Sequence, residues 1–99
     1  MTPRPLRYDA IKAEFARRLR LRVDGSGLTQ MQVVKLVQEQ MPEHGRFERG
    51  NLSSYLAGHT LPRPLVFHAM CRAFEVAPDE LMPPTKDRVE YAASSRGAL

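Results

Sequence analysis

The sequence predicts an all-α protein, a compact bundle of five short helices. Three observations support this fold class. Apolar residues recur at three- and four-residue spacing along most of the chain. Glycines and prolines divide these stretches into short segments. No segment shows the alternation of apolar and polar residues that is typical of a half-buried strand. The 99 residues amount to one domain, and a hydrophobic content of 42% supplies one modest core.

The first helix is expected from about Tyr8 to Val23. Ile11, Phe15 and Leu19 recur every four residues, so they share one helical face. The two glycines within 24–27 are expected to end this helix.

Thr29 and Gln32 mark the start of the second helix. A threonine followed three residues later by glutamine forms a capping box, in which each side chain bonds the other residue's backbone amide. An apolar stripe continues until Pro42 is expected to end the helix; its members are Val33, Leu36, Val37 and Met41.

The third helix is expected to start at Glu48. Phe47 and Leu52 have the spacing of a hydrophobic staple around that start. Gly58 is expected to end the helix as a left-handed cap.

Two more helices complete the predicted bundle. Pro64 suits the first turn of the fourth helix, and Pro78 opens a short fifth helix. The expected buried residues of this region are Phe67, Met70, Cys71, Phe74, Val76 and Leu81. The chain therefore divides into a flexible basic arm (1–7), a helical domain (8–82) and a polar tail (83–99) that is either disordered or part of a dimer contact.

The charge of the chain points to a nucleic-acid partner. The net charge is +4, and twelve of the fifteen basic residues are arginine. Arginine carries a fixed fork of donors that suits phosphate and guanine. The arginine bias also has a plainer explanation, a GC-rich genome.

Several other classes of protein are not expected. Cys71 is the only cysteine, so no intramolecular disulfide and no cysteine-based zinc site is possible. No apolar run approaches the roughly 20 residues that span a bilayer, and the amino terminus lacks the apolar core of a signal peptide. His44 and His59 have no neighbouring ligand types, and no nucleophile or phosphate loop is recognisable. We therefore expect a cytoplasmic protein that is not an enzyme, with no cofactor, metal, membrane contact or small-molecule ligand.

Three segments together resemble the Cro/C1-type (XRE-like) helix-turn-helix family of phage and bacterial regulators. Leu28-Thr29-Gln30 resembles the opening of its second helix, and Leu52-Ser53-Ser54-Tyr55-Leu56-Ala57-Gly58 resembles its third. The fourth and fifth helices also follow the family, so the resemblance runs from about Phe15 to Leu81. The chain departs from the family in two ways. Eighteen residues separate Gln30 from Arg49 where the family has nearer ten, which implies an enlarged connection, and Leu56 stands where the family often has glutamate.

The resemblance implies a set of DNA contacts. In the family the start of the third helix enters the major groove, and the residue that opens the second helix grips the DNA backbone. Arginine can bond two guanine acceptors at once and asparagine can do the same on adenine, each discriminating by about 1–3 kcal/mol. The residues expected to face bases are Arg49, Gly50, Asn51 and Ser54. Those expected to meet phosphates are Thr29, Gln30, His59, Thr60, Arg63 and Arg18.

Several of these assignments have a simpler alternative, which for Arg18 is a solvated face of the first helix. Arg49 is otherwise a solvated arginine, and Gln30 otherwise occupies an exposed first turn. Asn51 is otherwise the N-cap of a helix that begins later than Glu48.

We therefore expect a sequence-specific regulator of double-stranded DNA, acting as a repressor and as a homodimer on a two-fold site. The dimer contact is expected around Leu81 to Tyr91, or alternatively at Met41 and Phe47. Three alternative functions remain open: an antitoxin or operon controller of the same fold, a protein-interaction module, and a non-specific architectural DNA binder.

Overall fold

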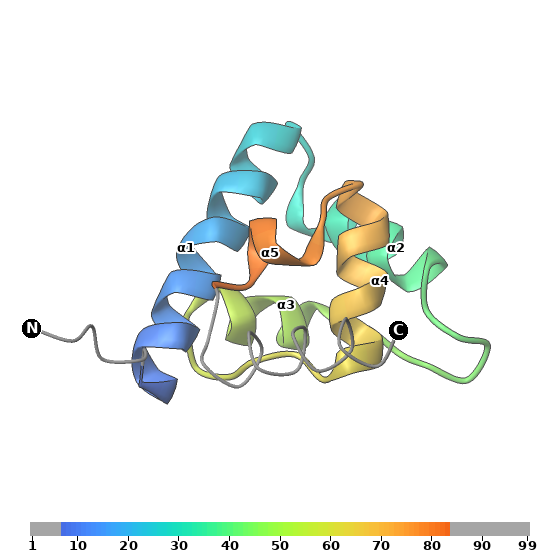
Figure 1. The fold of residues 1–99 in the computed structure, drawn as a ribbon. Coiled ribbons are helices and arrows are strands. Elements are labelled where there is room, and N and C mark those ends of the chain that lie inside the picture. The colour runs from blue at the N-terminus through green and yellow to red at the C-terminus, as the bar shows by residue number, and fades with distance from the viewer. Residues whose placement is uncertain (1–6, 84–99) are drawn as a thin grey trace, which may run out of the picture.

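The computed structural model describes residues 7–83, and all the regular secondary structure of this part of the chain is helical (Figure 1). The all-α, five-helix prediction is therefore confirmed. The basic arm and the polar tail lie outside the described residues, apart from Arg7 and Pro83, and the division into arm, domain and tail stays a prediction. The helices are α1 (Tyr8–Ser26), α2 (Gln30–Glu39), α3 (Arg49–Leu56), α4 (Pro64–Phe74) and α5 (Pro78–Leu81).

The helices surround one core, and α5 lies between α1 and α4 (Figure 1). α3 packs against α1 and α2, while α4 packs against α2 and α5. Phe15 is fully buried at the centre, and its ring makes edge-on contacts with Tyr55 of α3 and Phe67 of α4. α1 and α2 therefore hold α3 by its buried face. The most deeply buried side chains include Phe15, Leu19, Val33, Val37, Leu52, Met70 and Leu81.

α1 continues three residues beyond the expected end at Val23. Gly25 is accommodated inside the helix, and only Gly27, with a φ of 71°, leaves it in the left-handed conformation. A glycine within an exposed helix costs only about 1 kcal/mol, so a single glycine does not end a helix. Gly27 ends it because glycine adopts a positive φ without steric cost.

The predicted capping box at the start of α2 is confirmed. The amide of Gln32 donates to the Thr29 hydroxyl oxygen (3.2 Å), and the amide of Thr29 donates to the Gln32 side-chain oxygen (2.8 Å). α2 ends at Glu39, three residues before Pro42, which was expected to end it. A residue that precedes proline disfavours the helical conformation, so the helix stops before Met41. The additional residues between α2 and α3 therefore lie in the connection, 40–48, and not in the helix.

The boundaries of α3 follow the expected signals. Glu48 is the N-cap, and the staple residues Phe47 and Leu52 are both buried. At the other end Gly58 has a φ of 75°, and the amide of His59 donates to the Ser54 carbonyl (3.0 Å), as in a Schellman motif.

α4 buries a slightly different face from the expected one. Pro64 occupies its first turn as predicted. Ala69 joins Met70 and Cys71 as a buried residue, whereas Phe67 and Phe74 are half-buried and pack around the edge of the core.

Candidate nucleic-acid interface

The amino end of α3 is open to solvent. Glu48, Arg49, Gly50 and Asn51 are all exposed, while Leu52 in the next position is fully buried. The helix is therefore anchored by its apolar face and presents its first turn outward. The enlarged connection does not cover this turn.

Arg49 and Gly50 leave this end of the helix unobstructed. Within residues 7–83, the Arg49 guanidinium forms no ion pair or hydrogen bond, so its donors are available. A Cβ added at Gly50 would meet no atom within 4 Å. A larger residue would therefore fit at this position of the described structure.

Asn51 has a structural role that neither sequence interpretation described. Its side-chain oxygen accepts a hydrogen bond from the backbone amide of Glu48 (2.9 Å). Asn51 is thus the third residue of α3 and not its N-cap, which is Glu48. Its side-chain NH₂ group remains free of hydrogen bonds to the described residues and can donate outward.

A surface groove of about 480 Å³ brings together five of the ten residues predicted for DNA contact, whereas Arg49 is exposed but does not line it. One wall is the exposed side of α3, and the other is the connection to α4 with the first turn of that helix. Both charged residues in the lining are arginines, and no carboxylate lines the groove. The lining consists of Arg46, Gly50, Asn51, Ser54, Tyr55, Thr60, Leu61, Arg63 and Val66.

Tyr55 joins this groove to the core. Its ring stacks on Phe47, with the centroids 6.2 Å apart, and only 7% of the residue is exposed. Burial raises the pKa of the Tyr55 phenol, and the positive charge of Arg63 opposes this effect. The phenol therefore stays neutral at physiological pH.

Of the predicted residues that follow α3, Thr60 and Arg63 line the groove, whereas His59 does not. His59 and Arg63 are exposed, and Arg63 is the N-cap of α4. Thr60 is half-buried, and its hydroxyl donates to the Leu61 carbonyl (3.2 Å), so its oxygen can still accept.

Thr29 and Gln30 do not line this groove. Gln30 is the exposed first residue of α2. The hydroxyl oxygen of Thr29 is occupied by the Gln32 amide, which leaves its hydrogen free to donate. Both stay candidates for backbone contact at the amino end of α2.

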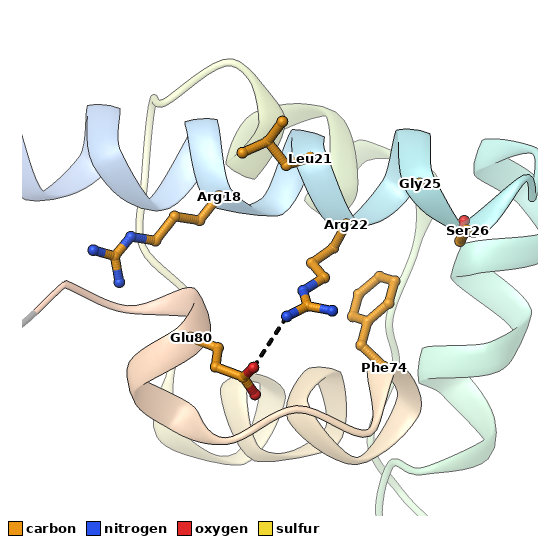
Figure 2. A pocket seen from close by; sticks show the side chains of 7 residues that line it. All are labelled: Arg18, Leu21, Arg22, Gly25, Ser26, Phe74 and Glu80. Carbon is orange, nitrogen blue, oxygen red and sulfur yellow. Dashed lines mark hydrogen bonds and ion pairs between the residues drawn. The ribbon is translucent and has the colours of Figure 1, made fainter.

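The structure does not bring Arg18 into this groove. Arg18 lies on α1 in a pocket shared with α5, beside the ion pair of Arg22 and Glu80 (3.1 Å; Figure 2). Its guanidinium donates to the Glu14 carboxylate (2.8 Å) and to the Asp79 carbonyl (2.8 Å). Sequence periodicity placed Arg18 on a polar face but could not show that its donors tie α1 to α5.

Glu14 is held in its charged form by two arginines. The hydrogen bonds from Arg17 and, second, from Arg18 lower the pKa of the Glu14 carboxyl from 4.5 to about 2. This cluster is an exposed ion-pair network on α1.

Arg46 is the charged groove residue that sequence reasoning missed. It is exposed and precedes the staple residue Phe47 by one position. The only sequence signal was a positive charge in the enlarged connection next to the third helix, and the conformation of that connection could not be inferred from spacing.

Two expected dimer anchors are not available on the surface. Phe47 is 3% exposed and Leu81 is fully buried, both within the core of the same chain. These two residues were therefore wrongly expected at a dimer contact; Tyr91 lies outside the described residues.

Two further features bear on possible partners. Within residues 7–83, no helix is long and apolar enough to cross a membrane. In the same range, no three histidine, cysteine or acidic side chains gather closely enough to hold a metal ion.

Comparison with known protein families finds a match over most of the described chain. A protein-family model described as a helix-turn-helix domain matches residues 14–83, which is more than half of the chain. No curated protein and no solved structure matches the chain. The matched segment includes all of α2 to α5 and most of α1.

Proposed function

Because this chain belongs to the helix-turn-helix domain family, we propose that it is a sequence-specific transcriptional regulator that reads double-stranded DNA with the amino end of α3. One observation carries the proposal. The first turn of α3 is exposed and unobstructed, although the rest of the helix is anchored in the core. A helix presented in this way fits the major groove, which is about 12 Å wide.

Two side chains on this turn suit direct readout of bases. Arg49 has free donors for the two acceptors of guanine. Asn51 can donate from its NH₂ group to adenine N7, while its oxygen, which has two lone pairs, holds the Glu48 amide and can accept from adenine N6. Gly50, between them, allows the helix backbone to approach the base edges closely.

Contacts to the DNA backbone would fix the position of α3. Arg63 and Thr60 line the groove after the carboxyl end of α3, and the exposed His59 immediately precedes Thr60. At the amino end of α2, free amides and the helix dipole favour a phosphate next to Thr29 and Gln30.

The regulator is proposed to be a repressor that occludes a promoter, since this output needs no surface beyond the DNA contact. One reading helix covers few base pairs, so a homodimer on half-sites about 34 Å apart is proposed to supply the specificity. Such a protein acts where bacterial or phage DNA is transcribed, in the cytoplasm.

Binding-site selection from random duplexes tests the proposal. We expect one motif to be enriched and bound at least about a thousandfold more tightly than random DNA. Arg49→Ala should reduce this ratio, because it removes a base contact. Arg72→Ala is the matched control. It also removes one positive charge, but from the last turn of α4, whereas the groove is lined by the first turn of that helix. It should leave the ratio unchanged. A selection that enriches no motif would refute sequence-specific regulation and favour the architectural alternative.

A further inference from the structure

We propose that the connection 40–48 is a second DNA-contacting element, in which Gln38 positions Arg46 to bind a phosphate beside the groove that α3 enters. This inference rests on the proposed function, because it assigns a contact within the same complex. It concerns the enlarged segment by which this chain departs from the family pattern.

The side chain of Gln38 fixes the backbone on both sides of Arg46. Its NH₂ group donates to the Gly45 carbonyl (2.9 Å), and its oxygen accepts from the Phe47 amide (2.6 Å). One side chain on α2 therefore satisfies a backbone acceptor just before Arg46 and a backbone donor just after it. Arg46 itself is left exposed between these two bonds.

The rest of the connection is also held in place. The amide of Gly45 donates to the Pro42 carbonyl (2.8 Å), which closes a turn. Phe47 anchors the other end, because its ring is buried against Tyr55. A Cβ at Gly45 would lie 2.8 Å from the terminal methyl carbon of Met41, so the turn is closely packed. The connection bows out at the edge of the molecule next to the start of α3 (Figure 1).

The charges around Arg46 favour a phosphate on the α3 side. Arg46 shares the groove with Arg63, and no carboxylate lines it. Arg46 also borders a second hollow, which is lined by Glu43 and Glu48, and these carboxylates would repel phosphate there. Within residues 7–83, Arg46 makes no ion pair, so its five donors remain available for the bidentate geometry that arginine forms with phosphate.

The position of Arg46 relative to α3 favours contact with a DNA phosphate over contact with a base. Arg46 precedes the helix and lies outside its first turn, whereas Gly50 and Asn51 are on the turn itself. When the turn of α3 occupies the major groove, a residue to its side meets the strand that borders that groove. Contacts of this kind position a protein without reading sequence.

The test measures affinity for the selected duplex and for a random duplex over a range of salt concentrations. Arg46→Ala should weaken binding to both duplexes by a similar factor, about tenfold, and should reduce the slope of log K against log salt by about 0.9. Arg46→Lys should keep most of the slope, because it keeps the charge. Arg72→Ala is again the matched control for loss of charge, and its slope should stay close to that of the wild type.

The positioning role of Gln38 is tested by Gln38→Ala and by the double variant with Arg46→Ala. Gln38→Ala should reduce the salt slope while circular dichroism still shows the helical fold, and adding Arg46→Ala should cause little further loss. Fully additive losses would overturn the positioning role.

Two results would overturn the phosphate contact. The first is that the Arg46→Ala variant binds both duplexes as tightly as the wild type does. The second is that this variant loses affinity for the selected duplex only, which would make Arg46 a base reader. Either result leaves the proposed function intact if a motif is enriched and Arg49→Ala still reduces specificity. If no motif is enriched, the proposed function fails instead.

Discussion

The side-chain oxygen of Asn51 accepts a hydrogen bond from the backbone amide of Glu48, 2.9 Å away. The residue proposed to read adenine therefore also closes the first turn of the helix that carries it. This bond orients the amide group of Asn51 before any DNA is present. A reading side chain held in this way loses less conformational entropy on binding than a free one would.

Two substitutions of Asn51 should separate these roles. Asn51→Ala removes the acceptor for the Glu48 amide and should lower the free energy of unfolding by about 1 kcal/mol. Asn51→Asp keeps an acceptor and adds a negative charge at a helix amino end, so stability should be retained. Both variants should lose discrimination at one A·T pair, because neither can donate to adenine N7.

Urea denaturation and binding to duplexes with that pair replaced would measure the two effects. If Asn51→Asp still discriminates at every position as the wild type does, Asn51 does not read adenine.

Gly50→Ala should stabilise the protein and weaken DNA binding. A Cβ at this position meets no protein atom within 4 Å, and alanine is favoured over glycine in helices by up to about 1 kcal/mol. If the backbone of α3 approaches base edges here, the added methyl group must collide with DNA. Gly25→Ala is the matched control, because Gly25 also lies within a helix, α1, where a Cβ would meet no atom within 4 Å, and it does not line the groove. A Gly50→Ala protein that gains stability and binds DNA normally would show that the backbone does not come close.

The local signals that predicted the fold are those that act over a few residues. The Thr29 and Gln32 capping box and the positive φ of Gly58 depend on neighbours along the chain, and both are found where the sequence indicated. Gly25 was expected to help end α1 but lies inside it, because the cost of one glycine is smaller than the stability that packing gives the helix.

The site was less predictable because its contacts are long in range or lie in irregular backbone. Arg18 bonds the carbonyl of Asp79, 61 positions away, which no local pattern reveals. Arg46 was missed because its placement depends on the two hydrogen bonds of the Gln38 side chain across the connection. The sequence predicted a site at the start of the third helix, which stays a prediction, and gave no placement for the turn beside it.

Phe47 should be a main anchor of α3, although it lies outside the helix. Its ring is 3% exposed and stacks on Tyr55, so Phe47→Ala should lower the free energy of unfolding by about 3–5 kcal/mol. Leu65→Ala, at a position that is 66% exposed, should change it by less than about 0.5 kcal/mol. Urea denaturation compares the two, and equal effects would contradict the anchoring role.

The ion pairs of Glu14 should make stability depend on pH in the acid range. Hydrogen bonds from Arg17 and Arg18 lower the pKa of this carboxyl from 4.5 to about 2 in the folded protein. Between about pH 5 and pH 2 the unfolded chain binds the proton more readily, so the free energy of unfolding should fall as the pH is lowered. Glu14→Gln should show a smaller fall over this window in urea denaturation at a series of pH values. Parallel curves for the two proteins would mean that the ion pairs do not contribute.

The entry of the amino end of α3 into the major groove is tested most directly by replacing one guanine of the selected site with 7-deazaguanine, which lacks the N7 acceptor. The position to change is the guanine at which Arg49→Ala loses discrimination. The wild-type protein should lose at least about 1 kcal/mol of binding free energy on this replacement. The Arg49→Ala variant should bind the modified and the unmodified duplex almost equally well. If both proteins lose the same amount, Arg49 does not contact that base edge, and the proposed position of α3 on DNA is wrong.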